Sequence, residues 1–165
     1  MAWVNLEPGR YMFVCFIPAR DRMPHAMKGM VAQLDVAGDP LGDRAPRATL
    51  TLSAREYALD FSAPPHAGMA TIEFRNTGAQ EHDYALIQLP DSADPVATAR
   101  RLGRADTTLR DVKLVGGSGP IAPGRRSWSR ATLARGHYAV VCFASDTGDG
   151  RSHYLHGMVR TFDVP

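Results

Sequence analysis

The chain has 165 residues, of which 44% are hydrophobic and 22% charged, and its formal net charge is +2. This length suits about one domain with a substantial core, and the composition is globular rather than disordered. The small net charge gives no reason to expect nucleic acid as a partner, and no apolar run is long enough to span a bilayer. Two cysteines are too few for a disulfide framework.

Short strands dominate the predicted elements. In most of these segments apolar and polar residues alternate, and the segments are rich in β-branched or aromatic residues. Most are separated by Gly, Pro, Asn or Asp. In chain order the predicted strands span residues 11–17, 30–36, 48–53, 56–61, 70–75, 83–89, 127–133, 138–143 and 158–164. Many short strands with such punctuation predict an all-β fold, an antiparallel sandwich or barrel.

Two segments between these strands have a different pattern. Residues 92–105 are predicted to form one short inserted helix, because Ser92 or Asp94 can cap it, a proline follows in its first turn and apolar residues recur at helical spacing. Residues 115–124 are rich in glycine and precede a polar strand rather than a helix, which predicts a turn.

The two ends of the chain repeat one another. The segment "GRYMFVCF" (9–16) corresponds to "GHYAVVCF" (136–143), and "HAMKGMVAQLDV" (25–36) corresponds to "HYLHGMVRTFDV" (153–164). The copies are offset by 127 residues at the cysteine and 128 at the histidine, which is about one domain length.

A tandem array explains this repeat. Residues 48–165 are then one complete unit, residues 37–47 a linker rich in Gly, Pro and charge, and residues 1–36 the C-terminal strand pair of a partial preceding unit. The strands of the partial unit lack their natural sheet partners. We expect them to add to the edge of the 48–165 sandwich or to exchange into a second chain as a homodimer, rather than to be disordered.

Metal-binding residue types gather near the last two predicted strands. Cys142, His153 and Met158 lie on or beside the loop that joins them, and His82 follows the turn-forming sequence Asn-Thr-Gly at residues 76–78. A thiolate, imidazoles and a thioether together suit copper. The partial unit repeats three of these residue types as Cys15, His25 and Met30.

These residues form a recognisable pattern. It consists of an Asn-x-Gly turn followed by a histidine, and then of G-x-Y-x-x-x-C, a histidine and G-M; the positions are Asn76, Gly78, His82, Gly136, Tyr138, Cys142, His153, Gly157 and Met158. The pattern resembles the cupredoxin family, the plastocyanin- and azurin-like blue copper proteins. The resemblance covers residues 48–165 as a whole domain and 1–36 as a partial one.

The resemblance implies a Greek-key β-sandwich that binds one copper per chain. Cys142 would supply the thiolate, His82 and His153 would complete a trigonal plane, and Met158 would be the weak axial ligand. Cys15, His25 and Met30 would form a vestigial or partial metal site. The implied function is single-electron transfer to a redox partner protein rather than enzymatic catalysis, in the periplasm or outside the cell as for a bacterial exported protein, although no signal peptide opens the chain.

One departure from the family pattern supports an alternative. Ten residues separate Cys142 from His153, a longer loop than in well-known blue copper proteins. The alternative is a metal-free or copper-storing module of the same fold, used for binding or assembly. His156 offers a second imidazole in this loop, but His153 is preferred because the N-terminal copy repeats it and has Lys28 in the place of His156. The loop carboxylates, such as Asp146 and Asp149, are expected to be solvated.

Overall fold

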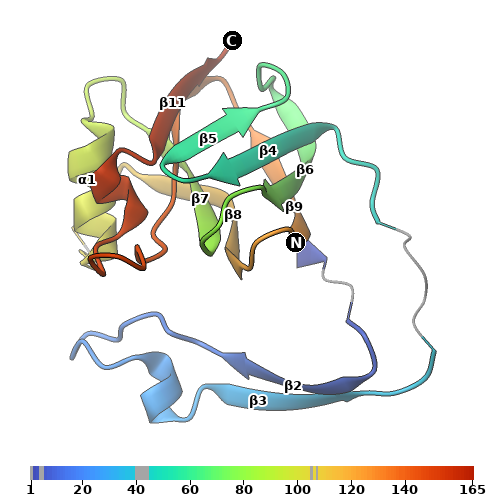
Figure 1. Ribbon diagram of the computed structural model, residues 1–165. Coiled ribbons are helices and arrows are strands. Elements are labelled where there is room, and N and C mark those ends of the chain that lie inside the picture. Colours follow the sequence, from blue (N-terminus) through green and yellow to red (C-terminus); the bar gives the residue numbers. More distant parts are fainter. Residues whose placement is uncertain (1, 4–5, 40–44, 105, 107) are drawn as a thin grey trace. The chain divides into compact units, whose positions relative to one another are not determined.

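The structure, a computed structural model, describes residues 2–3, 6–39, 45–104, 106 and 108–165. The chain divides into two compact units, Val4–Ala45 and a larger unit made of Met1–Trp3 with Pro46–Pro165 (Figure 1). Each unit is described by itself. No helix in the described part of the chain is long and apolar enough to cross a membrane.

The larger unit contains two β-sheets. The first has the strand order β1-β9-β6-β4-β5, and the second has the order β11-β10-β7-β8. Their bounds are β1 Ala2–Trp3, β4 Leu50–Arg55, β5 Ala58–Phe61, β6 Gly68–Asn76, β7 His82–Leu89, β8 Lys113–Ile121, β9 Arg126–Leu133, β10 Gly136–Val141 and β11 Val159–Val164. All neighbours are antiparallel except β4 and β6, which are parallel.

The chain crosses repeatedly between the sheets. It leaves the first sheet after β6, forms the pair β7 and β8, returns as β9 beside β6, and then enters the second sheet again as β10 and β11. The predicted all-β Greek-key sandwich with one short inserted helix is therefore confirmed. The alternation of apolar and polar residues along the strands explains this sandwich, because every second side chain then points into the space between the two sheets.

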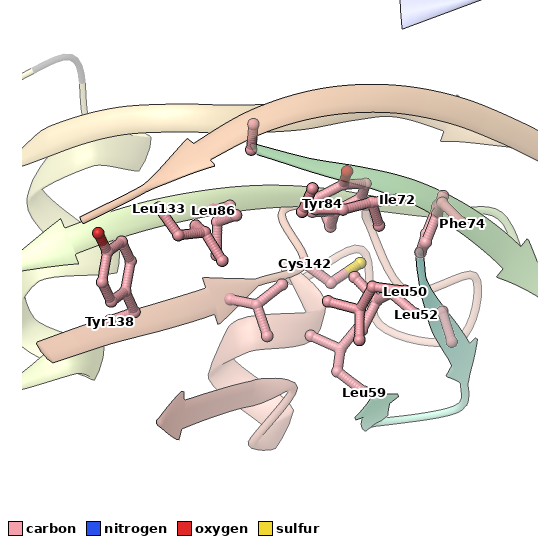
Figure 2. Packing of buried hydrophobic residues seen from close by; sticks show 14 of the residues in the cluster. Leu50, Leu52, Leu59, Ile72, Phe74, Tyr84, Leu86, Leu133, Tyr138 and Cys142 are labelled. Carbon is pink, nitrogen blue, oxygen red and sulfur yellow. The ribbon is translucent and has the colours of Figure 1, made fainter. Parts of the chain in front are cut away.

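The core lies between the two sheets. Strand β4 shows the alternation plainly, since Leu50, Leu52 and Ala54 are buried while the residues between them are partly exposed. Phe74 and Tyr84 pack across the interface between the sheets, with ring centroids 4.9 Å apart. Cys142 belongs to the same buried cluster, and Figure 2 shows its sulfur among the apolar side chains. The candidate metal-binding thiol thus lies at the core and not at the surface.

A helix covers the other face of the second sheet. Strands β7 and β10 contribute Ile87 and Val141 to a second buried cluster, in which Ala99 of α1 (Pro95–Gly103) also lies. The Asp94 carboxylate caps this helix by accepting from the amide of Ala97 at 2.6 Å. The predicted helix is therefore confirmed, with Asp94 as its cap. Four consecutive residues of β10, from Tyr138 to Val141, are buried, so this central strand is covered on both faces where it approaches Cys142.

The turn predicted for residues 115–124 is confirmed only at its end, where the amide of Arg125 donates to the carbonyl of Ala122 at 3.0 Å and Gly124 has a φ of 73°. Residues 113–121 form strand β8, which pairs with β7 and is irregular after His82 and after Leu86. Two of the strand's glycines allow close approach, since a Cβ at Gly117 would lie 2.7 Å from the carbonyl oxygen of Tyr84 and one at Gly116 would lie 3.1 Å from Cβ of Ala131.

The smaller unit is a single hairpin. Strand β2 (Gly9–Val14) pairs with β3 (Val31–Val36), and a 3₁₀ turn, η1 (His25–Lys28), lies in the connection between them. A corresponding turn, η2 (His153–His156), lies between β10 and β11 of the larger unit. The division of the chain into one complete and one partial tandem unit remains a prediction.

Candidate metal centre

The four predicted ligand residues lie at the ends of strands or in the turn between β10 and β11 of the larger unit. His82 is the first residue of β7, Cys142 directly follows β10, and His153 opens η2. Met158 lies between η2 and β11, and its carbonyl accepts from the amide of Cys142 at 3.1 Å. The side chains of all four residues are fully buried. The structure therefore brings the candidate ligands to one end of the core.

Three donor atoms converge there. The Sγ atom of Cys142 lies 3.5 Å from Nδ1 of His153 and 3.8 Å from Nδ1 of His82, and the two Nδ1 atoms are 3.1 Å apart. Each imidazole thus presents the same nitrogen to the thiol. This is the group of residues that could hold a metal ion in the core of this unit.

The long loop between Cys142 and His153 is closed by its own hydrogen bonds. Ser145 and Ser152 form an isolated bridge, and the amide of His153 donates to the carbonyl of Ala144 at 2.8 Å. The intervening residues are thus a small hairpin projecting from the site. Because residues 144 and 153 are held side by side, the length of the loop does not loosen the position of the His153 ring.

Asp146 is central to this small hairpin. Its carboxylate accepts from the Tyr57 hydroxyl at 2.5 Å, from the Gln80 side-chain amide at 2.9 Å, and from the amides of Gly148 and Asp149. The expectation that Asp146 is a solvated loop residue is wrong, because its side chain is buried. These hydrogen bonds, the one from Tyr57 first, lower the pKa of Asp146 below its usual value. Asp149 is exposed, as expected.

Carboxylates face the outer nitrogens of both imidazoles. Nε2 of His82 lies 3.6 Å from Oε1 of Glu56, and Nε2 of His153 lies 3.8 Å from Oδ2 of Asp146. Neither nitrogen has a hydrogen-bond partner among the described residues. A nearby carboxylate favours the tautomer that carries its proton on Nε2. That tautomer leaves both Nδ1 lone pairs directed at the same point as the sulfur.

Glu56 and Tyr57 occupy the two-residue turn between β4 and β5. The ring of Tyr57 meets the His153 ring edge-on, with centroids 5.6 Å apart. Tyr57 has a φ of 61°, a left-handed conformation that is unfavourable for a bulky residue. One tight turn therefore places a carboxylate beside His82 and an aromatic ring beside His153. No local pattern in the sequence marks either residue.

Burial sets the protonation of the group. It lowers the pKa of His82 and of His153 below the ordinary value of 6.5, so both imidazoles are neutral at pH 7. Burial, together with the nearby Asp83 carboxylate, raises the pKa of Cys142 to about 12. Asp83 also accepts hydrogen bonds from the amides of Phe143 and Ala144, and so secures the chain just after the cysteine.

The donor set fits copper. Two neutral imidazoles can share at most one proton along the 3.1 Å line between their Nδ1 atoms, and the tautomer favoured by the carboxylates provides none. A cation at that point would satisfy both lone pairs. Sulfur and imidazole donors together select copper, zinc or iron–sulfur clusters over hard cations, and the buried thioether of Met158 favours copper.

The other predicted residues are distributed differently. His156 contacts the Asp149 carboxylate at 3.2 Å and lies outside the buried group, and the preference for His153 as the ligand stays a prediction. In the smaller unit, Cys15 and His25 are also brought together, with Sγ and Nδ1 3.7 Å apart. Met30 is joined to both residues through its backbone.

The predicted resemblance to the cupredoxin family is confirmed at the level of the fold. The structure has two facing sheets, a histidine at the start of β7, and Cys, His and Met residues around the last hairpin. No family model and no curated protein matches the chain.

Three solved structures are similar to part of the chain. A dithionite-reduced auracyanin from Roseiflexus castenholzii is 19% identical with a TM-score of 0.47, covering 70% of this chain and 94% of that one. Auracyanin B is 21% identical with a TM-score of 0.45, covering 73% and 92%. Auracyanin A, a "blue" copper protein from Chloroflexus aurantiacus, is 17% identical with a TM-score of 0.45, covering 70% and 99%.

Proposed function

We propose that the chain is a single-electron carrier that binds one copper ion through His82, Cys142, His153 and Met158. The observation that carries the proposal is the convergence of one sulfur and two Nδ1 atoms in a fully buried group. Bound copper would supply a centre that accepts and releases one electron. Cys142 would bind it as a thiolate after losing its proton, and the Met158 thioether would act as a weaker donor that adjusts the potential.

Burial favours electron transfer over catalysis. His82, Cys142 and His153 are all fully buried, so a substrate has no direct approach to the donor atoms. An electron needs only a short path, and the ring of Tyr57, which contacts His153 and is partly exposed, offers one to the surface. The two central strands and the closed hairpin around Asp146 hold the ligands in place, which keeps the reorganisation between oxidation states small.

We place the function in the periplasm or outside the cell, as the family resemblance implies, and cell fractionation would test this. We expect a redox partner protein, and the surface around Tyr57 would determine which protein can bind.

Titration of the full chain with Cu(II) tests the function. A thiolate bound to Cu(II) gives an intense visible absorption band, so we expect a blue protein that saturates near one equivalent. Cys142→Ser should abolish the band, and Met158→Leu should keep the copper but change its reduction potential.

Two matched pairs of variants assign the ligands. His153→Ala should abolish the band, while His156→Ala, three residues along the same turn, should leave it intact. Cys15→Ser should retain the band that Cys142→Ser loses. The metal-free or copper-storing alternative predicts no intense visible band in the unmodified chain. Copper binding that survives His153→Ala but not His156→Ala would overturn the ligand assignment.

A further inference from the structure

The hairpin of the smaller unit reproduces the backbone around the candidate ligands of the larger one. The amide of Cys15 donates to the carbonyl of Met30 at 3.2 Å, and the amide of Met30 donates to the carbonyl of His25 at 3.0 Å. The corresponding bonds of Cys142, Met158 and His153 measure 3.1 and 3.0 Å. The glycine before each methionine has nearly the same left-handed φ, 91° and 93°. Two short sequences thus specify one backbone geometry.

This backbone places the same donor pair together. Nδ1 of His25 lies 3.7 Å from Sγ of Cys15, compared with 3.5 Å for His153 and Cys142. The smaller unit contains no second histidine, so the donor set is one thiol, one imidazole and one thioether. Cys15 and His25 are also partly exposed, where their counterparts are fully buried.

Thioethers are concentrated in this hairpin. It contains four of the seven methionines in the chain. All four are exposed: Met12, Met23, Met27 and Met30. Met30 is 59% exposed, whereas its counterpart Met158 is fully buried. Exposed methionines supply soft donors that water does not satisfy, and thiolate and thioether ligands select Cu(I) among biological metal ions.

We propose that the hairpin of the smaller unit binds a Cu(I) ion through Cys15, His25 and Met30. On binding, the Cys15 thiol releases its proton to water and the sulfur binds the metal, without any change in oxidation state. The site is colourless, since the electron-rich Cu(I) ion has no low-energy thiolate band. It is open to solvent and exchanges its ion faster than the buried group does. The proposal stands apart from the function proposed for the larger unit, because it uses none of the same residues.

Anaerobic titration of the full chain with Cu(I), in competition with a chromogenic Cu(I) chelator, tests the proposal. We expect two Cu(I) ions per chain, the second of lower affinity. Cys15→Ser and His25→Ala should each reduce the count to one. Met69→Leu should leave it at two, because Met69 is as exposed as the hairpin methionines but lies in β6 of the larger unit.

Two further readouts separate this site from adventitious Cu(I) binding elsewhere on the chain. NMR of ¹³C-labelled methionine methyl groups should show the Met30 signal shifting with the second equivalent while the Met69 signal stays in place. Cys142→Ser should remove the buried site and leave the hairpin site titratable. The proposal would be overturned if Cys15→Ser and His25→Ala left the number of bound Cu(I) ions unchanged, or if Cys142→Ser abolished all Cu(I) binding. It would also be overturned if the hairpin bound only half an equivalent of Cu(I) and sedimentation showed one ion shared between two chains.

Discussion

Replacing Asn76 by alanine should destabilise the metal-free larger unit by about 3 kcal/mol, counted as roughly 1 kcal/mol for each of three lost hydrogen bonds. The side-chain amide nitrogen of Asn76 donates to the carbonyls of Gln80 at 2.7 Å and Ile121 at 2.8 Å, and its oxygen accepts from the amide of Gly78 at 2.9 Å. Asn76 is buried, so water replaces these partners poorly. The side chain ties the turn before His82 to the end of β8.

Urea unfolding followed by circular dichroism measures this change. With a slope of about 1.5–2 kcal/mol per molar urea, typical of a small domain, the midpoint should fall by about 1.5–2 M. Thr77→Ala is the matched control, because Thr77 is the exposed neighbour in the same turn and donates one hydrogen bond, to the carbonyl of Ala54 at 3.1 Å. If both variants shift the midpoint equally, the three buried bonds of Asn76 do not stabilise the turn as argued.

Three other predictions follow from the same region and from the division of the chain. Gly78→Ala should weaken copper binding, measured by competition with a chelator, because the added Cβ would lie 2.8 Å from Nε2 of His82 and 2.6 Å from Oε1 of Glu56; unchanged affinity would show that the ring moves freely. The metal-free protein should lose stability as the pH falls below 6.5, because His82 and His153 have lowered pKa values in the fold and the unfolded chain then binds more protons; a urea midpoint at about pH 5 equal to that at pH 7 would contradict this. Deleting residues 1–45 should leave a folded domain that associates less, because both core clusters lie within residues 50–164 and only the short strand β1 is lost from the sheet; a melted circular dichroism spectrum would place the N-terminal segment in the core.

Local chemistry in the sequence was enough to predict most elements and the ligand types. Strand β4 has an apolar residue at every second position, and such a strand must bury one face. Asp94 before a proline predicts a helix start, because a carboxylate can satisfy the free amides of the first turn. The sequence alone could predict that Cys142, His153 and Met158 lie close together, because backbone hydrogen bonds within a segment of 17 residues hold them there. The N-terminal copy, which lacks a sandwich, forms the same bonds.

Strand β8 could not be predicted in this way. Gly116 and Gly117 look like turn residues locally, yet they are needed because Ala131 of β9 and Tyr84 of β7 approach them closely. Such close approach is a property of the paired sheets and not of the segment.

The surroundings of the metal centre were decided only by the tertiary structure. Glu56 lies 26 positions before His82, and Tyr57 lies 96 positions before His153, so nothing near either histidine in the sequence indicates its neighbour. Asp146 looks like a solvated turn residue until β4 and β7 bring Tyr57 and Gln80 to it. Hydrogen bonds of this kind form only when the two sheets stack, because stacking sets the distances between their loops. Residue type therefore determined which atoms could bind a metal, whereas sheet packing decided their burial, their protonation and the direction of their lone pairs.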